Sequence, residues 1–291
     1  MKIKLLIQLN FQNGLGNLYC GVVQLLHFAN YYKELGYECN FIFASKNISG
    51  NGWGIDNLCI EELFDMDSFD VFNTITNLEY SIVDKEYNGY TYYGSGTPGV
   101  SWWDVFFSSD IDIFHKLSYE NHDRNIFSSK EFIPKKIPKF NSKINEKVNK
   151  FKLQSPQIDA SIQLRLFGFG DKENYGQSLI KFYDDLYESV KKSNKKFFLT
   201  SSCVSCLGEL LNLPNIFLID SRISDDNKGD TIIFDNRESI LNFLYDNIAE
   251  MILISETDII YHKTVLPWTS TYLYYSFVNN PNVSILPINN L

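Results

Sequence analysis

The strongest constraint on the fold is a strand–turn–helix–strand pattern at the start of the chain. Residues 3–8 form an apolar run of strand length, which ends in a polar turn at residues 10–16. Apolar side chains then recur at helical spacing, at Leu15, Tyr19, Val22, Leu26 and Ala29. Gly36 ends this helical pattern, and residues 39–44 form a second strand-like run. A strand, a helix and a strand in this order predict a βαβ unit, and therefore a parallel sheet.

The second half of the chain shows the same alternation of strands and helices. Strands are predicted at residues 158–166, 196–201, 216–219, 251–255 and 283–286. Helices are predicted at residues 177–192, 204–211, 235–249 and 265–277, and Asp235 with Glu238 resembles a capping box. Residues 47–110 are rich in glycine, asparagine, aspartate and aromatic residues, and their strands are not assigned. We therefore expect an open α/β sheet in each half, with ligands at the carboxyl ends of the strands.

A lysine-rich segment separates the two halves. Residues 130–152 contain eight lysines, two glutamates and the prolines Pro134 and Pro138, and residues 141–151 have an amphipathic helical pattern. This composition indicates a linker followed by a solvated helix, with a basic surface for an anionic ligand as the alternative. We predict an N-terminal domain at residues 1–140 and a C-terminal domain at residues 141–291, with a cleft between them.

Charge and hydropathy exclude several classes of protein. The chain has 26 lysines and arginines against 35 aspartates and glutamates, a net charge of −9, which argues against a general nucleic-acid coat. No stretch approaches the roughly 18 apolar residues of a membrane helix, and the N-terminal run turns polar too soon for a signal-peptide core. We expect no nucleic-acid partner, no membrane span and a cytoplasmic location.

Cysteine and histidine form no familiar catalytic motif. The five cysteines are an odd set without a secretory signal, which argues against a disulfide framework. Cys203 and Cys206 fit two cysteines that pack at a helix start better than a redox pair or a zinc site, which needs two more ligands. His27 falls within the first helix, and His262 is expected in a loop from which it could face the cleft. The absence of HExxH, GxSxG and P-loop motifs excludes zincins, α/β-hydrolases and P-loop kinases.

The first candidate for ligand binding is the turn between the first strand and the first helix. Gly14, Gly16 and Asn17 lie where a helix N-terminus offers free N–H groups to an anion or a sugar hydroxyl, and glycine lets the backbone approach a ligand. The turn is not a dinucleotide fingerprint, because Gly21 comes five residues after Gly16. A tight strand–helix turn without a ligand is the other interpretation.

Two further candidates lie in the second half. Arg165 ends a predicted strand and precedes a glycine-containing loop, so it can grip a phosphate bidentately. A surface arginine paired with a carboxylate is the alternative. Thr269, Ser270 and Thr271 lie near a helix start, where hydroxyl and N–H groups suit a phosphate oxygen, although such residues also act as simple N-caps.

These elements, in this order, resemble the fucosyltransferase superfamily with the GT-B fold, especially α-1,2-fucosyltransferase-like and protein O-fucosyltransferase-like enzymes. Gly14-Leu15-Gly16-Asn17 is similar to the G-x-[LF]-G-N turn that opens these enzymes. Gln163-Leu164-Arg165, with Gly168 and Asp171 after it, is similar to their H-x-R strand end, with glutamine in place of histidine. Trp268-Thr269-Ser270-Thr271 is similar to their S-x-[FS]-S-like turn. The resemblance spans most of the chain.

The resemblance implies a GT-B-like α/β fold, with two Rossmann-like α/β/α domains that face a central cleft. The N-terminal domain is then the acceptor side and the C-terminal domain the nucleotide-sugar side. The implied activity is transfer of a sugar, expected to be fucose, from a GDP-sugar such as GDP-fucose to a carbohydrate acceptor. Transfer would invert the sugar carbon and need neither a metal nor another cofactor.

The resemblance also implies roles for individual residues. Arg165 would be catalytic, because it would stabilise the charge that grows on the β-phosphate of the leaving group. Ser201 ends a strand where many relatives place an aspartate that contacts the nucleotide. The implied donor-binding residues are Gly14, Gly16, Asn17, Gln163, Arg165, Ser201, Thr269, Ser270 and Thr271. The general base is not identified, and Asp104, Asp110 and His27 are candidates.

Two other functions stay open at this point. Gln163 stands where the family has histidine, and no base is evident, so a non-catalytic nucleotide-sugar or glycan-binding relative is one alternative. A different α/β enzyme, such as a Rossmann-type oxidoreductase or a cysteine-based redox protein, is the other.

Overall fold

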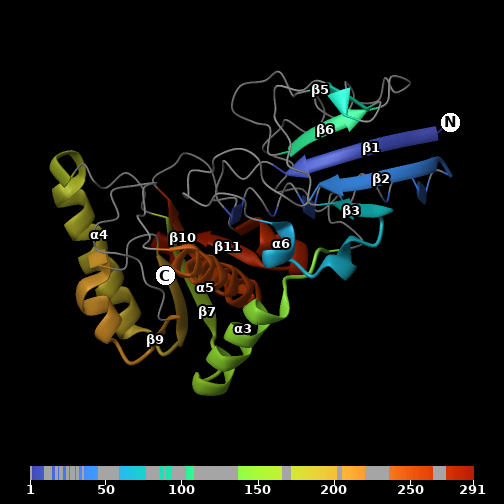
Figure 1. Ribbon diagram of the computed structural model, residues 1–291. Coiled ribbons are helices and arrows are strands. Elements are labelled where there is room, and N and C mark those ends of the chain that lie inside the picture. The colour runs from blue at the N-terminus through green and yellow to red at the C-terminus, as the bar shows by residue number, and fades with distance from the viewer. Residues whose placement is uncertain are drawn as a thin grey trace. The chain divides into compact units, whose positions relative to one another are not determined.

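The chain folds as two units, each built on its own sheet, in a computed structural model. The units are Met1–Ser142 and Lys143–Leu291. The structure describes residues 2–9, 15–16, 19, 22–23, 26, 30, 33–34, 36–44, 59–76, 86–87, 90–93, 103–107, 137–165, 172–201, 205–219, 236–264 and 273–291. Helices and strands occur in both units (Figure 1), so the α/β class predicted from the sequence is confirmed.

The first unit begins with the predicted βαβ pattern. Strands β1 (Lys2–Leu9), β2 (Glu38–Ala44) and β3 (Thr74–Thr76) run parallel, with Gln8 opposite Ala44 in the register. Every described residue from 15 to 34 is helical. The helix buries the expected apolar stripe, with Leu15, Tyr19, Val22 and Leu26 each at most 9% exposed. Ala29, the fifth residue of that stripe, lies outside the described residues.

The other half of this sheet is antiparallel, which the parallel pattern at the start of the chain did not predict. Strand β6 (Trp103–Phe107) pairs antiparallel with β1, and β5 (Tyr90–Tyr93) and β4 (Glu86–Tyr87) continue outward from it. The strand order is therefore β3-β2-β1-β6-β5-β4. These strands fall within residues 47–110, where antiparallel neighbours need no helical crossover and leave no helix pattern to read.

An aromatic cluster fixes the end of the first unit. The Phe140 ring stacks on Phe64 with ring centres 5.0 Å apart, and lies 5.6 Å from the ring of Tyr19. The backbones of the two segments are hydrogen-bonded as well: the Asp65 N–H donates to the Lys139 carbonyl at 2.8 Å. Residues 137–141, part of the predicted linker, are thus packed against the first unit.

The second unit contains a wholly parallel sheet. Its order is β11-β10-β7-β8-β9, and the strands are β7 (Ala160–Arg165), β8 (Phe197–Ser201), β9 (Ile216–Phe217), β10 (Ile259–Thr264) and β11 (Ser284–Pro287). Four of the five strands predicted in this half are confirmed to within a few residues. In such a sheet all carboxyl ends lie at one edge, where open α/β sheets bind ligands.

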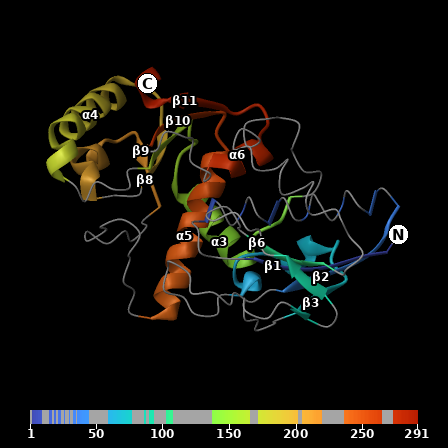
Figure 2. The ribbon, with the colours of Figure 1, turned by 90° about the horizontal axis from the view of Figure 1, so that it is seen from above.

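Helices cover both faces of this sheet (Figures 1 and 2). Helix α4 (Lys172–Lys192) and the 3-10 helix η5 (Ser205–Asn212) pack on one face, in a core cluster that includes Leu164. Helices α3 (Ser142–Gln154) and α5 (Arg237–Ser255) cover the other face, where Phe151 of α3 meets Phe198 of β8. Among the helices in the described ranges, none is long and apolar enough to cross a bilayer.

The predicted strand at residues 251–255 is wrong. These residues are the last turns of α5, and the strand that follows is β10, four residues further on. Every residue of α5 from 248 to 255 is buried, including the apolar run at its end. A helix buried on all sides shows no amphipathic period, so a short apolar run in it looks like a buried strand.

Helix boundaries differ from the prediction at three other places. The N-cap of α5 is Asn236, whose Oδ1 accepts from the Ser239 N–H at 2.9 Å, because asparagine caps a helix as well as aspartate. The predicted helix at 204–211 is η5, interrupted by Gly208 at φ +50°. Of the predicted helix at 265–277, the described part starts at residue 273 and contains α6 (Tyr274–Asn279).

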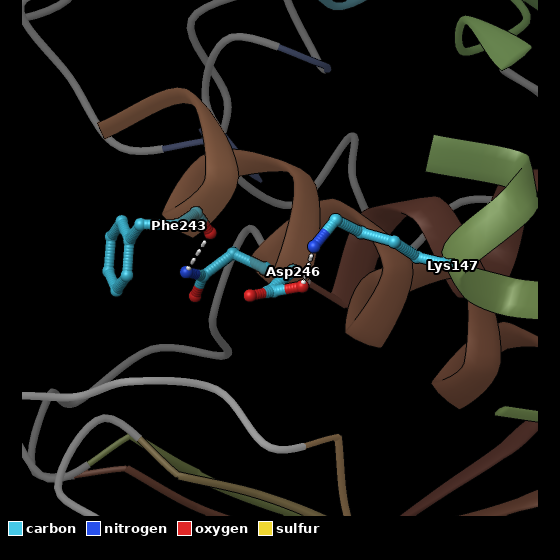
Figure 3. Close-up of polar contacts among 4 residues, drawn as sticks. Lys147, Phe243 and Asp246 are labelled. Atoms are coloured by element: carbon cyan, nitrogen blue, oxygen red, sulfur yellow. Dashed lines mark hydrogen bonds and ion pairs between the residues drawn. The ribbon is translucent and has the colours of Figure 1, made fainter. Parts of the chain in front are cut away.

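An ion pair joins the two helices on the α3/α5 face. Figure 3 shows Lys147 of α3 extending to Asp246 of α5, with Nζ 2.5 Å from Oδ1. The two side chains are only 31% and 15% exposed. The chain offers a matched exposed pair, Lys181 and Asp185 of α4, at 2.6 Å with side chains 75% and 65% exposed.

Asp246→Asn is expected to lower the free energy of unfolding by about 1–2 kcal/mol, because Lys147 would keep its charge in a partly dehydrated place. Asp185→Asn should change it by less than about 0.5 kcal/mol, because water and salt already screen the exposed pair. Urea denaturation of both variants measures the difference. Equal effects would show that burial does not strengthen the Lys147–Asp246 pair.

Candidate functional site

The carboxyl ends of β7, β8 and β10 meet at one edge of the second sheet. Arg165, the last residue of β7, is in register with Thr264, the last residue of β10. One residue earlier, Leu164 is in register with Ser201, the last residue of β8. Arg165 therefore lies at the end of a strand, as the sequence predicted, and the structure shows that this strand is the central one of the sheet.

The two faces of the sheet separate the predicted donor-binding residues. Side chains alternate along a strand, so Gln163 and Arg165 share one face, and Leu164 lies on the other. Leu164 packs in the core cluster beneath α4, and its register partner Ser201 shares that face. The structure thus brings Gln163 and Arg165 together on the α3/α5 face, and places Ser201 on the opposite face.

A row of polar residues crosses the sheet just below its carboxyl edge. Gln163 lies between His262 of β10 and Thr200 of β8, each in register with it. Gln163 is 5% exposed and Thr200 4%. Polar side chains are rare in such buried positions unless they form hydrogen bonds or serve a site.

Two polar atoms of this row lack hydrogen-bond partners. Among the described residues, Gln163 Oε1 and His262 Nδ1 are both buried and accept or donate no hydrogen bond. One row deeper, the polar group is satisfied, since the Thr257 hydroxyl donates to Ser161 Oγ at 2.9 Å. The unmatched polar atoms therefore belong to the row next to Arg165 and not to the deeper row.

Burial lowers the pKa of His262 below its usual value of 6.5, and the neighbouring Lys263 ammonium lowers it further. The imidazole is consequently neutral at pH 7. The amino group of Lys263 itself lies 5.8 Å from the centre of the Phe182 ring of α4, on the other face of the sheet. A neutral imidazole beside an amide suits hydrogen bonding to an uncharged or anionic ligand oxygen.

The lowered pKa of His262 predicts a pH dependence of stability. The unfolded chain binds the proton near pH 6.5 and the folded chain only at lower pH, so stability falls as the pH drops through this window. One such group contributes a slope of at most about 1.4 kcal/mol per pH unit. Urea denaturation from pH 7.5 to 5 should show this loss in the wild type and not in His262→Asn. A stability difference between the two proteins that is constant with pH would contradict the prediction.

His262 is the residue of this edge that the sequence prediction placed in a loop. It lies instead in β10, because the strand follows α5 rather than ending at residue 255. The β-branched and aromatic run Ile259-Ile260-Tyr261 directly before His262 is the local signal that could have placed it in a strand. Its pairing with Gln163 depends on strand order, which no local pattern carries.

Several predicted residues lie outside the described residues, and others are described only in part. Those outside are Gly14, Asn17, His27, Asp110, Cys203, Thr269, Ser270 and Thr271. Gly16 is helical and buried in the first unit, and Asp104 lies in β6 opposite Gln8. Cys206 lies in η5.

Within the described ranges, no three His, Cys, Asp or Glu side chains form a group that could hold a metal ion.

Comparison with known proteins identifies the fold. No protein-family model matches this sequence, and no curated protein sequence matches it. The solved structures that match include three of the fucosyltransferase NodZ, and each covers almost the whole chain. The structure of NodZ from Bradyrhizobium is 12% identical and has a TM-score of 0.56, covering 100% of this chain and 96% of that one.

The other two are NodZ α-1,6-fucosyltransferase structures. One was soaked with GDP-fucose and is 12% identical, with a TM-score of 0.54 and coverage of 97% and 94%. The other was co-crystallised with GDP and is 11% identical, with a TM-score of 0.51 and coverage of 95% and 92%. The chain therefore has the fold of these fucosyltransferase structures, which confirms the GT-B-like fold that the resemblance implies.

Proposed function

We propose that this protein is a glycosyltransferase that uses GDP-fucose as its donor. The observation that carries the proposal is the fold, shared along nearly the full length of both chains with fucosyltransferases whose structures were obtained with GDP-fucose and with GDP. Arg165 at the carboxyl edge of a parallel sheet supports it, because nucleotides bind at such edges and arginine pairs with phosphate bidentately.

In the proposed reaction a carbohydrate hydroxyl attacks the sugar carbon from the side opposite GDP, and the configuration of that carbon inverts. The bond from the carbon to the β-phosphate oxygen breaks, and negative charge grows on the diphosphate. Arg165 stabilises this charge, which is larger in the transition state than in the bound donor. With guanidinium and backbone N–H groups in this role, the reaction needs no metal.

The remaining assignments of the site are part of the same proposal. The second unit holds the donor through Gln163, Arg165, Ser201 and the turn at 269–271, and the first unit binds the acceptor. Gly14, Gly16 and Asn17 contribute helix-start N–H groups to the donor. The residue that accepts the proton of the acceptor hydroxyl is sought among the carboxylates and histidines of the first unit.

A non-catalytic relative that only binds a nucleotide sugar is the second candidate. The observation that favours it is Gln163, a neutral amide where the family has histidine. Such a protein would be stabilised by GDP-fucose and would neither transfer nor hydrolyse it.

GDP and GDP-fucose are expected to raise the melting temperature of the protein, and EDTA should not reverse the effect, because ligand binding to the folded state alone stabilises it by mass action. UDP and ADP serve as matched controls of equal charge. GDP-fucose hydrolysis or transfer separates the enzyme from the binding protein. Stabilisation by UDP and not GDP would discard fucose, and no response to any nucleotide would contradict the proposal.

A further inference from the structure

The two unmatched atoms of the polar row lie on neighbouring strands. Gln163 and His262 are directly paired in the parallel register of β7 and β10, so their backbones are about 4.8 Å apart and their side chains share one face. Gln163 Oε1 and His262 Nδ1 are both buried without a hydrogen bond among the described residues. Side chains of directly paired neighbours on one face of a sheet can contact each other.

The two atoms are chemically complementary. An amide oxygen can only accept a hydrogen bond, whereas Nδ1 of a neutral imidazole donates when it carries the ring proton. On its other side His262 is in register with Pro287, whose side chain has no polar group. Gln163 is therefore the polar cross-strand neighbour of His262, and Thr200 is the second cross-strand neighbour of Gln163.

We propose that His262 is a positioning residue for Gln163, with Nδ1–H donating to Gln163 Oε1. This bond fixes the amide so that its NH₂ group is directed to the ligand. Arg165 lies two residues further along β7 on the same face, about 6.6 Å away along the strand. The amide and the guanidinium then offer hydrogen-bond donors to one oxygen-rich ligand, which is a nucleoside diphosphate if the proposed function holds.

The environment of His262 agrees with this role. Burial and the charge of Lys263 keep its pKa low, so the imidazole is neutral at pH 7 and carries one proton whose position is decided by its hydrogen bond.

The ring proton provides a test that does not depend on any nucleotide. The protein is labelled with ¹⁵N-histidine, and its four histidines are observed by NMR at pH 7.5. His262 is assigned from the signals that disappear in His262→Asn, and urea denaturation shows that the second unit of the variant is folded, because the other three histidines belong to the first unit. We expect Nδ1 of His262 to be protonated in the wild type and to lose the proton to Nε2 in Gln163→Leu. An unprotonated Nδ1 in the wild type overturns the proposed hydrogen bond. A Gln163→Leu variant with the same His262 tautomer as the wild type also overturns it.

GDP affinity tests the consequence for the ligand. We expect His262→Leu and Gln163→Leu each to weaken GDP binding about tenfold, and the double variant to be no weaker than either, because the two side chains act as one unit. His262→Asn should stay within about threefold, since its amide N–H replaces Nδ1–H. Thr200→Val is the control for the other neighbour of Gln163 and should also stay within about threefold.

The outcomes separate this inference from the proposed function. Additive losses in the double variant, or full affinity in His262→Leu, overturn the positioning role while the wild type still binds GDP. A wild type that does not bind GDP overturns the proposed function and the ligand part of the inference. The tautomer experiment then still tests whether Gln163 and His262 form the hydrogen bond.

Discussion

Arg165→Lys is expected to lower kcat/KM for GDP-fucose by about 100-fold or more, the loss typical of removing one fixed donor to a developing anion. Lysine keeps the charge but cannot bind two phosphate oxygens at once, as the planar guanidinium does. Arg165 is well placed for such a fixed role, because β7 has strands on both sides in a parallel sheet. Release of GDP from GDP-fucose, with and without a carbohydrate acceptor, measures the loss.

Arg237→Lys is the matched control for this prediction. Arg237 is exposed at the first residue of α5, so the same exchange there should leave turnover within about twofold of the wild type. Melting temperatures of the two variants show whether either has lost its fold. Near-normal turnover in Arg165→Lys would remove Arg165 from the donor site. An equal loss in Arg237→Lys would point to a general effect of the exchange.

The sequence predicts the second unit well where strands are short and flanked by polar turns. Strands β7 and β8 were found within two residues of their bounds, since each is a buried run of five or six residues between helices. Helix α5 and strand β10 were confused, because the end of α5 is apolar on every side and the local pattern favours neither element. Continuity was the usable signal, because no glycine or proline separates the amphipathic start of α5 from the apolar run at its end.

The candidate site was predictable only to the level of one strand. Gln163 and Arg165 follow from the position of β7 and from the rule that ligands meet strand ends. Their neighbours His262 and Thr200 come from strands nearly 100 and about 40 residues away, and it is sheet order that places them in one row. Ser201 ends its strand as expected, yet its face follows from the register with Leu164, which the sequence does not specify.

Leu244→Ala is expected to lower the free energy of unfolding of the second unit by about 3 kcal/mol, within the 2–5 kcal/mol typical of fully buried leucines. Leu244 of α5 has no exposed surface, so its removal leaves a cavity that the parallel sheet and its helices can only partly close. Helix α5 contacts β7 and β8, the strands that carry Arg165, Gln163 and Thr200. The same variant should therefore also weaken GDP binding, with a smaller change in free energy than the loss of stability.

Leu153→Ala is the matched control, because Leu153 of α3 is 88% exposed and loses almost no burial when it is shortened. Its effect should stay below about 0.5 kcal/mol. Since the chain has two units, hydrogen exchange of the α5 amides is a better measure than a single melting curve, as it reports the opening of the second unit itself. Similar protection in the two variants would mean that the packing around Leu244 does not hold α5 in place. The support of β7, the strand of Arg165, would then have to come from other elements.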